Sequence, residues 1–337
     1  MTASRKIRVL TVIVNYRSAA LTLESIRSLL PERSENLEMR IVVVENQSGD
    51  EAALRAGLAQ FEDVTLIVAE KNGGFSYGNN IGFQHAYSSG WVPDYFQLLN
   101  PDTRIFPGAI RALVSFMESH PRAGIAGSRF QNADGSEWPY AFRFPSVFSE
   151  VEAGLRIGLA TRLLGSRMVL QRMGDTPAQV DWIPGASMLL RREMIEQVGG
   201  LDEEYFLYYE ETDFCLKARR HGWECWYVPE SRVVHLAGQS TGVTSDDAAT
   251  RPMPAYWFES RSRYFKRNHG YLYAALTNTA TVAAHLLGDA KQFALRREPA
   301  KPGFIRGLLT QATRDLLQRD VREERAYRPG ATGAAPH

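Results

Sequence analysis

The sequence predicts an α/β protein built on a Rossmann-like, mostly parallel sheet, followed by a helical C-terminal extension. Residues 9–14 and 41–44 are continuous runs of apolar, mostly β-branched residues. Such runs are typical of strands that are buried on both faces, whereas half-exposed strands alternate. Strand-like and helix-like patterns also alternate along the first hundred residues, which is the order expected of an α/β sheet.

The remaining elements of the N-terminal part follow from the same patterns. Residues 21–30 have helical spacing, with Leu23, Ile26 and Leu30 on one side, and strands are expected at 64–68 and 95–99. Each expected strand ends in polar or glycine-rich residues. In open α/β sheets ligands bind outside the carboxyl ends of the strands, so we expect these ends to share one crevice. The segments concerned are Asn15-Tyr16, Glu45-Asn46, Asn72-Gly73-Gly74 and Asn100-Pro101-Asp102.

From about Ala123 the pattern is mixed. We expect an amphipathic insertion over 147–164, a strand over 181–190 beside a Pro-Gly bend, and short helices over 192–198 and 213–220, which end at Gly199-Gly200 and His221-Gly222. Beyond about Gly242 a polar connection leads to helices that extend to about Arg325. Residues 328–337 are rich in Pro, Gly and Ala and are expected to be disordered.

Composition excludes several classes of protein. The 337 residues are 44% hydrophobic and 23% charged, as in globular proteins, and 39 basic residues nearly balance 38 acidic ones, so no global field favours nucleic acid. The two cysteines, Cys215 and Cys225, offer no disulfide framework and fit a reducing compartment. We recognise neither a signal peptide nor a confident membrane span, and therefore expect a cytoplasmic protein.

The C-terminal helices have apolar stripes with basic residues nearby. One stripe runs from Leu272 to Leu287 and a second from Ile305 to Leu316, with Arg306, Arg314 and Arg319 opposite the second. Basic amphipathic helices can lie on anionic membranes, here the inner face of the plasma membrane. Packing on the body of the protein or on another subunit is the more common reason for such stripes.

Three carboxylates occur within four positions at Glu210, Glu211 and Asp213, with aromatic and aliphatic residues on both sides. Partial desolvation raises the pKa of such carboxyls toward the range that suits a general base. The same pattern also fits the acidic first turn of a helix, which needs no chemistry. A second notable segment, 71–82, is rich in Gly and Asn and permits a ligand to approach the backbone closely. Its spacing matches neither a dinucleotide fingerprint nor a P-loop.

Eight segments in one order make the chain resemble the family 2 glycosyltransferases, which have the GT-A fold. The resemblance extends over residues 8–240 and is greatest to bacterial rhamnosyltransferases that build surface polysaccharides. Its segments are 12–16, 42–48, 72–80, 99–102, 184–188, 199–202, 210–213 and 233–235. The resemblance implies a GT-A domain over 1–242, with a nucleotide-binding half (1–122) and an acceptor half (123–242), followed by the helical extension (243–327) and the tail (328–337).

The resemblance also implies a metal-dependent reaction. Asn100-Pro101-Asp102 stands where the family has two acids that bind Mg²⁺ or Mn²⁺, and His235 stands where many relatives place a histidine on the same metal. Hard cations prefer carboxylate oxygens, and an imidazole ligand shifts the preference toward Mn²⁺. Because Asn100 replaces an acid, Asp102 and His235 are the expected ligands. A Pro-Asp turn and a structural histidine are the alternatives.

The remaining site residues are expected around that cation. The donor-binding set is Asn15, Tyr16, Glu45, Asn72, Gly74, Phe75, Asn79, Asn80, Asn100 and Asp102; Glu45 stands where relatives use Asp to bind the base. The catalytic base of the family aligns with Glu211, where relatives have Asp, and the adjacent Glu210 is the alternative. The acceptor side is expected at Trp182, Gly185, Ala186 and Ser187, although Trp182 fits a packing role equally well.

The resemblance therefore implies an inverting transferase. It would move a sugar from a nucleotide-diphosphate donor, dTDP-L-rhamnose first and a UDP-sugar second, to a lipid-linked or polysaccharide acceptor. Two other functions remain open at this point. One is a catalytically inactive nucleotide- or glycan-binding module, which the Asn100 and Glu211 departures favour. The other is a nucleotidyltransferase that makes nucleotide sugars, although its Gly-rich N-terminal signature is missing.

Overall fold

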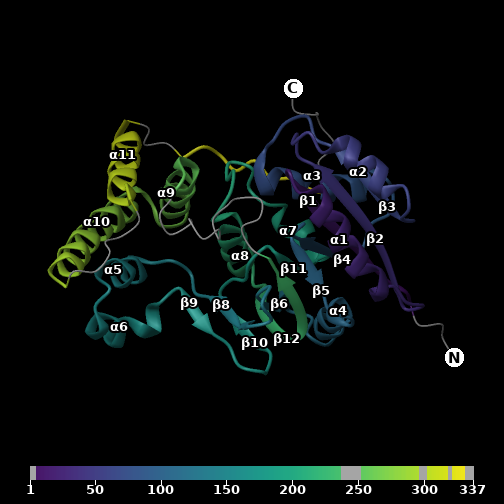
Figure 1. The fold of residues 1–337 in the computed structure, drawn as a ribbon, viewed down its shortest axis with the longest axis horizontal. Helices are drawn as coiled ribbons and strands as arrows, with labels where there is room; N and C mark the ends of the chain where they lie inside the picture. The colour runs from purple at the N-terminus through teal and green to yellow at the C-terminus, as the bar shows by residue number, and fades with distance from the viewer. Residues whose placement is uncertain (1–4, 237–251, 296–301, 318–320, 331–337) are drawn as a thin grey trace.

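A computed structural model describes residues 5–236, 252–295, 302–317 and 321–330. Its centre is a ten-stranded sheet in the order β10-β12-β6-β11-β4-β1-β2-β3, with β5 paired to β12 and β7 paired to β6. Helices cover the sheet, and the C-terminal helices α9 to α11 stand beside it (Figure 1). The predicted α/β class with a helical C-terminal extension is confirmed.

The N-terminal part agrees closely with the predicted pattern. Strands β1, β2 and β4 pair in parallel, as do β2 and β3. The predicted bounds of 64–68 and 95–99 coincide with β3 and β4. The elements are β1 (Ile7–Asn15), α1 (Ala19–Leu29), η1 (Leu30–Glu32), β2 (Leu37–Glu45), α2 (Glu51–Leu58), β3 (Val64–Val68), α3 (Gly74–Ser88) and β4 (Tyr95–Leu99).

The second part adds strands of both directions to the same sheet. Strand β11 runs antiparallel to both β4 and β6, and β12 runs parallel to β6. The elements are β5 (Thr103–Ile105), α4 (Ala109–Ser119), β6 (Ala123–Gln131), β7 (Glu137–Trp138), β8 (Tyr140–Phe142), α5 (Val147–Leu155), α6 (Gly158–Leu164), η2 (Gly165–Arg167), β9 (Leu170–Arg172), β10 (Ala178–Val180), β11 (Ser187–Arg191), α7 (Arg192–Val198), α8 (Glu210–Arg220) and β12 (Glu224–His235).

Besides shifts of one to four residues at the ends of β1, β2 and α1, four predicted boundaries differ from the structure. The expected stretch 147–164 is two helices, because Arg156 takes a left-handed conformation (φ 49°) and ends α5. Only the last part of 181–190 is a strand, since β11 begins at Ser187 after the Pro184-Gly185 bend. Helix α8 begins at Glu210, three residues before its predicted start, and the last described helix ends at Leu317 and does not reach Arg325.

The core explains why the strand runs are continuous. Val12, Val42 and Val44 belong to one hydrophobic cluster, while Ile13 and Val43 belong to a second cluster on the opposite face of the sheet. Neighbouring residues of a strand point to opposite faces, so a strand buried on both faces needs apolar residues at every position.

The C-terminal extension is α9 (Ala255–His269), α10 (Tyr271–Ala294) and α11 (Phe304–Leu317). No helix among the described residues has the length and apolar character that crossing a bilayer requires. After α11 the chain returns to the body of the protein. The backbone N–H of Gly200 donates to the Tyr327 carbonyl at 2.7 Å, and that of Glu203 donates to the Arg325 carbonyl at 2.7 Å. The predicted connection at 243–251 and the residues 331–337 lie outside the described part of the chain.

A buried group of charges joins this extension to the sheet domain. Arg263 of α9 donates to Asp202 through Nε (3.0 Å) and Nη2 (2.5 Å), and the Asp202 side chain is almost fully buried. Arg267, one turn further along α9, lies 3.5 Å from Asp213 of α8 and 2.9 Å from Glu324. Opposite charges stabilise each other strongly where water is excluded, so α8 and α9 are held in one arrangement.

Removing Asp202 should therefore destabilise the whole protein. The Asp202→Ala variant leaves the Arg263 guanidinium buried without its carboxylate, and we expect the free energy of unfolding to fall by about 3–5 kcal/mol. Urea unfolding followed by circular dichroism measures this. The control is Glu259→Ala, which breaks the exposed pair between Glu259 of α9 and Arg314 of α11 and should cost at most about 1 kcal/mol. Equal losses in both variants would contradict the importance of the buried group.

Candidate functional site

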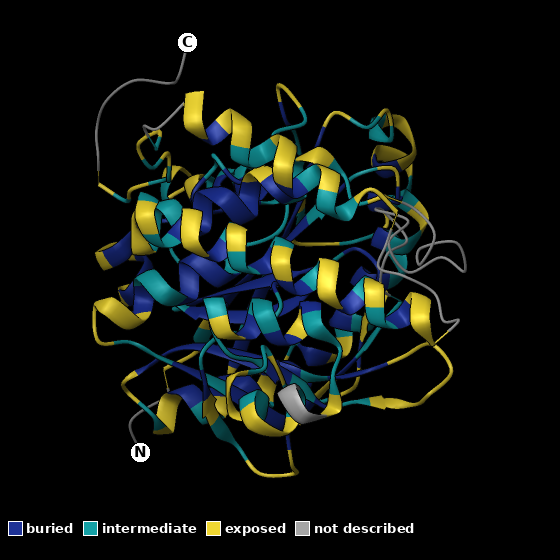
Figure 2. Cartoon of the chain, turned by 90° about the vertical axis from the view of Figure 1, so that its left-hand side faces the viewer, coloured by how far each residue is buried: buried dark blue, intermediate teal, exposed yellow. Residues whose placement is uncertain are grey.

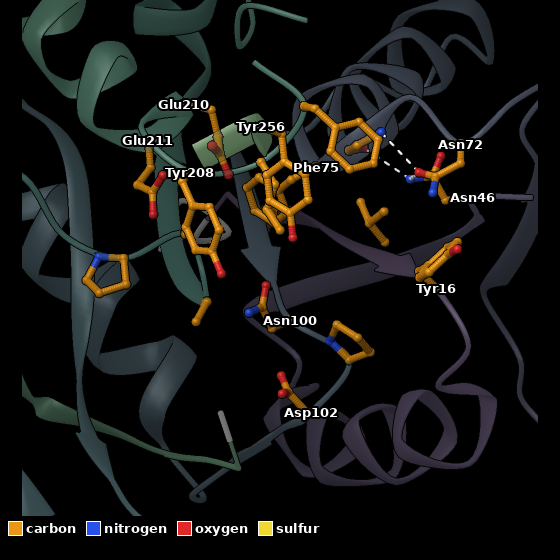
Figure 3. Close-up of a pocket in the computed structure, with 18 of the residues that line it drawn as sticks. Tyr16, Asn46, Asn72, Phe75, Asn100, Asp102, Tyr208, Glu210, Glu211 and Tyr256 are labelled. Carbon is orange, nitrogen blue, oxygen red and sulfur yellow. Dashed lines mark hydrogen bonds between the residues drawn. The ribbon is translucent and has the colours of Figure 1, made fainter. Parts of the chain in front are cut away.

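The carboxyl ends of β1, β2 and β4 open into a cavity of about 450 Å³, which α8 and α9 close on the other side (Figure 3). This is the crevice that the strand-end residues predicted. Its lining residues are Val14, Tyr16, Asn46, Asn72, Gly74, Phe75, Asn100, Pro101, Asp102, Pro184, Gly185, Ala186, Phe206, Leu207, Tyr208, Glu210, Glu211, His235 and Tyr256.

One end of the cavity is shaped by hydrogen bonds between Asn46 and the start of α3. Asn46 Nδ2 donates to Asn72 Oδ1 and to the Gly74 carbonyl, both at 3.1 Å, and Asn46 Oδ1 accepts from the Gly73 N–H at 3.3 Å. Tyr16 lies on the same side of the cavity (Figure 3). These amides and the phenol ring make a preformed wall that offers hydrogen bonds and one flat face to a ligand.

Gly74 has to be a glycine. Its φ is 83°, and a Cβ there would lie 1.9 Å from the Phe206 carbonyl oxygen. That same carbonyl accepts the Phe75 N–H at 3.1 Å. The start of α3 is therefore tied directly to the loop that precedes α8, which brings the two walls of the cavity together.

Asp102 and His235 are neighbours, as predicted. Asp102 Oδ1 lies 3.4 Å from His235 Nε2, and Asn100 Nδ2 lies 3.5 Å from the same nitrogen. Antiparallel pairing of β12 with β5 sets His235 opposite Thr103, and the Leu236 N–H donates to the Asp102 carbonyl at 2.9 Å. The strands themselves thus place the carboxylate and the imidazole side by side.

This set of donors fits a divalent cation that takes its other ligands from elsewhere. The described residues contain no group of three or more His, Cys, Asp or Glu side chains that could hold a metal alone. Asp102 and His235 supply two protein ligands, and a half-turn of the Asn100 amide about its last torsion presents its oxygen to the same point. Mg²⁺ and Mn²⁺ are commonly bound by a few protein groups together with water and phosphate oxygens.

Glu210 and Glu211 reach the same cavity from the first turn of α8 (Figure 3). Tyr208 and Tyr209 before them are both left-handed, with φ of 70° and 67°, a strained backbone that turns the chain into the helix. The Oε2 atoms of both glutamates are buried, and neither has a hydrogen-bond partner among the described residues. Burial raises the pKa of Glu211 to about 7, while burial and the adjacent Glu211 raise the pKa of Glu210 well above its ordinary value.

A carboxyl that titrates near neutral pH inside a ligand cavity can take up a proton from a bound hydroxyl. The partly exposed Glu211 suits that role better than Glu210, which is 4% exposed. The site therefore combines a group that can accept a proton with a pair that can bind a cation.

Three predicted donor-binding residues lie beneath the cavity wall. Asn15 is fully buried, donates to Asp50 and accepts from Ser18 and Thr22, so it holds the turn between β1 and α1 together. Glu45 accepts from the N–H (2.6 Å) and the hydroxyl (2.5 Å) of Ser48 in its own turn. Asn79 donates back to the Phe75 carbonyl within α3.

Asn80 and two predicted acceptor residues also point elsewhere. Asn80 exchanges hydrogen bonds with the Leu201 backbone across 2.8 and 3.0 Å. Ser187 is buried and shares its hydroxyl with Gln97 and Ser128 beneath the sheet surface. Trp182 stacks on Phe142 at 4.2 Å and donates to the Arg143 carbonyl, so the structure places it outside the lining.

Several lining residues were missed by the sequence patterns. Asn46 belongs to the predicted Glu45-Asn46 strand end but was not among the predicted donor-binding residues. Phe206 and Tyr208 precede the acidic stretch. Tyr256 comes from α9, and no sequence pattern indicated it. Its ring lies 5.4 Å from that of Phe206 and 6.0 Å from that of Tyr208.

Residues 7–253 match the family model described as Glycosyltransferase like family 2. The N-acetylglucosaminyl-diphospho-decaprenol L-rhamnosyltransferase of Mycobacterium tuberculosis is 30% identical over 213 residues, which are 60% of this chain and 68% of that protein. The dTDP-rhamnosyl transferase RfbF of Shigella flexneri is 27% identical over 230 residues, 68% of this chain and 69% of that protein.

Solved structures show the same fold. The crystal structure of GalNAc-T7 with UDP, GalNAc and Mn²⁺ has a TM-score of 0.58 at 14% identity and covers 93% of this chain and 58% of that one. The mannosyltransferase PcManGT from Pyrobaculum calidifontis, in complex with GDP-Man and Mn²⁺, has a TM-score of 0.55 at 15% identity, with coverages of 94% and 89%. Both resemblances establish the GT-A architecture.

The two buried carboxyls should make stability depend on pH. Both pKa values are raised, so the stability that Glu211 contributes is complete below about pH 4.5 and is lost as the pH rises through about 7, and Glu210 acts in the same direction. Glu211→Gln should therefore leave the melting temperature unchanged near pH 5 and raise it above that of the wild type near pH 8. Scanning calorimetry at both pH values checks this. Glu259→Gln, at an exposed site on α9, is the control, and an equal shift in both variants would rule out the buried pair as the cause.

Proposed function

Because this chain belongs to the glycosyltransferase-like family 2, we propose that it is an inverting transferase that moves L-rhamnose from dTDP-L-rhamnose to a hydroxyl of a lipid-linked or polysaccharide acceptor. The observation that carries the proposal is the cavity itself, which Glu211 enters from one wall and the Asp102–His235 pair from another. The rhamnosyltransferase relatives support the choice of sugar, and a UDP-sugar is the second choice of donor.

We assign the nucleotide diphosphate to the side formed by the strand ends. Tyr16, Asn46 and Asn72 would hold the nucleoside, and Asp102, His235 and Asn100 would hold a divalent cation, Mg²⁺ or Mn²⁺. When bound, that cation neutralises the charge of the leaving diphosphate. Mn²⁺ in the two solved GT-A structures supports a divalent cation here.

We assign the acceptor to the side formed by α8 and α9. Glu211 would take the proton from the acceptor hydroxyl as that oxygen bonds to the sugar carbon and the diphosphate departs. Glu210 lies deeper, and burial together with the charge of Glu211 would keep it protonated. Phe206, Tyr208 and Tyr256 form an aromatic wall that can stack on sugar C–H groups.

We propose that residues 1–242 form the transferase domain and residues 243–327 its helical extension. Within the domain, the nucleotide-binding half (1–122) would hold the donor and the half over 123–242 would provide most of the acceptor side. With a lipid-linked acceptor, the protein would act at the cytoplasmic face of a membrane, in a pathway of cell-surface glycan synthesis. Its C-terminal helices would make peripheral contact with that membrane.

A panel of nucleotide sugars tests the donor. We expect dTDP-rhamnose with Mn²⁺ to raise the melting temperature of the wild type, because a ligand bound to the native state stabilises it. In Asp102→Ala the shift should disappear and turnover should be abolished, since the cation contributes several kcal/mol to leaving-group stabilisation. A chelator should reproduce the effect in the wild type. Full activity of Asp102→Ala in chelator would refute the cation site, and donor binding with no turnover on any acceptor would favour an inactive binding module.

Substitution of the base tests the mechanism. Glu211→Gln should lower kcat by about 10²- to 10⁴-fold and leave donor affinity unchanged, because the base acts on the acceptor. Glu211→Asp should retain more activity, and Glu210→Gln should be milder than Glu211→Gln. In the wild type, kcat should fall below about pH 7 as Glu211 becomes protonated. The opposite ranking of the two Gln variants in steady-state kinetics would transfer the role to Glu210.

A further inference from the structure

Helix α10 exposes a mostly apolar face to the surroundings of the protein. Its exposed residues form one stripe along all 24 residues, and every one is uncharged: Leu272, Ala275, Leu276, Thr279, Ala283, Leu286, Leu287, Ala290, Phe293 and Ala294. Phe293 is 85% exposed, Leu272 84% and Leu287 62%. A helix at the surface of a protein normally exposes its polar side to water. The exposed apolar face of α10 therefore indicates contact with another apolar surface.

Thr277, Asn278 and Thr281 of α10 lie toward the inner side of the helix and form hydrogen bonds there. Thr281 and Asn278 accept from the buried guanidinium of Arg261, which also donates to Glu150 of α5 at 2.7 Å. Close packing of Gly288 against Gly154 holds α10 onto α5. These contacts lock the rotation of the helix, so the apolar stripe cannot turn inward.

Exposed apolar and basic residues also occur on α11, which packs against α10, and on α6 and η2, which follow α5, another helix that packs against α10. In Figure 2, which looks onto this side, exposed positions line the helices that cross the view. Leu317 of α11 is 83% exposed and Leu163 of α6 is 72% exposed. The acidic Asp289 of α10 is neutralised by its pairing with Arg156. Three exposed arginines remain, and no ion pair joins any of them to a carboxylate of the described residues: Arg162 of α6, Arg167 of η2 and Arg306 of α11.

We propose that α10, together with the adjoining faces of α6 and α11, lies flat on a membrane surface that contains anionic lipid. An apolar stripe bounded by arginines matches acyl chains beneath negative headgroups. A second copy of the chain fits less well, because symmetric pairing would bring like-charged arginine rims together. Since no described helix can cross a bilayer, contact in the plane of the interface is the geometry that remains.

This surface also lies close to the acceptor side, which is where the inference rests on the proposed function. Tyr256 near the start of α9 lines the cavity, and α9 ends at His269, directly before α10. The 15 residues of α9 span about 22 Å at 1.5 Å per residue. A lipid-linked acceptor could thus keep its lipid in the bilayer while its sugar reaches the cavity.

Vesicle flotation of the purified full chain tests the surface without any sugar. The wild type should float with phosphatidylcholine vesicles that contain phosphatidylglycerol, should bind pure phosphatidylcholine more weakly, and should lose binding as salt increases. The triple variant Leu276→Glu, Leu287→Glu and Phe293→Glu should lower the partition coefficient by at least about 100-fold. Three apolar side chains that would enter the lipid are lost, and three negative charges repel the anionic headgroups. Phe106→Glu, also exposed but next to α4, is the matched control and should bind as the wild type does.

Two results would overturn the proposal. One is a wild type that ignores anionic vesicles at low salt. The other is a triple variant that floats as the wild type does. A triple variant whose only difference from the wild type is a change from dimer to monomer, measured by light scattering, would also overturn the proposal. Turnover on a short, soluble acceptor separates this test from the proposed function, since the triple variant should keep wild-type turnover there and lose it only on acceptors held in vesicles.

Discussion

The salt bridge between Arg263 and Asp202 is the contact on which the rest of the site depends. Asp202 lies in the loop between α7 and α8, which continues into the left-handed Tyr208 and Tyr209 and then into Glu210 and Glu211. Two buried carboxyls of raised pKa and two strained residues all oppose folding. A rigid, charge-paired contact beside them offsets that cost and keeps the carboxyls pointed into the cavity. The stabilising Arg263–Asp202 pair thus lies beside the residues whose burial and backbone strain destabilise the fold.

Much of the fold could be predicted because the strands are buried on both faces. A continuous apolar run such as 41–44, which is buried throughout, leaves little choice of structure, and the predicted bounds 64–68 and 95–99 agree with β3 and β4. The antiparallel strand β11 was harder, since Pro184 and Gly185 interrupt its run and the ladder that defines its start comes from β4 and β6. Nor does local sequence reveal that the chain after α11 returns to Gly200, because both partners in that contact are backbone groups.

The same distinction applies to the site. The rule that ligands meet the carboxyl ends of strands located Tyr16, Asn72 and Asp102, which all line the cavity. It could not separate residues that face the cavity from neighbours that hold it together, and Asn15 and Ser187 proved to be fully hydrogen-bonded inside the protein. Which way a side chain points at a strand end depends on partners distant in sequence. Tyr256 is the extreme case, because it reaches the cavity only through the docking of a helix that lies after the matched family region.

The return of residues 321–327 to the body has a consequence for how the protein is made. Their backbone hydrogen bonds and the pairing of Glu324 with Lys217 and Arg267 complete the surroundings of α8. The N-terminal part of a chain leaves the ribosome first, so the sheet can assemble early. The loop that carries Asp202 forms its contacts with residues 321–327 only later. The surroundings of α8 therefore cannot be completed on a nascent chain until residues 321–327 have also emerged from the ribosome.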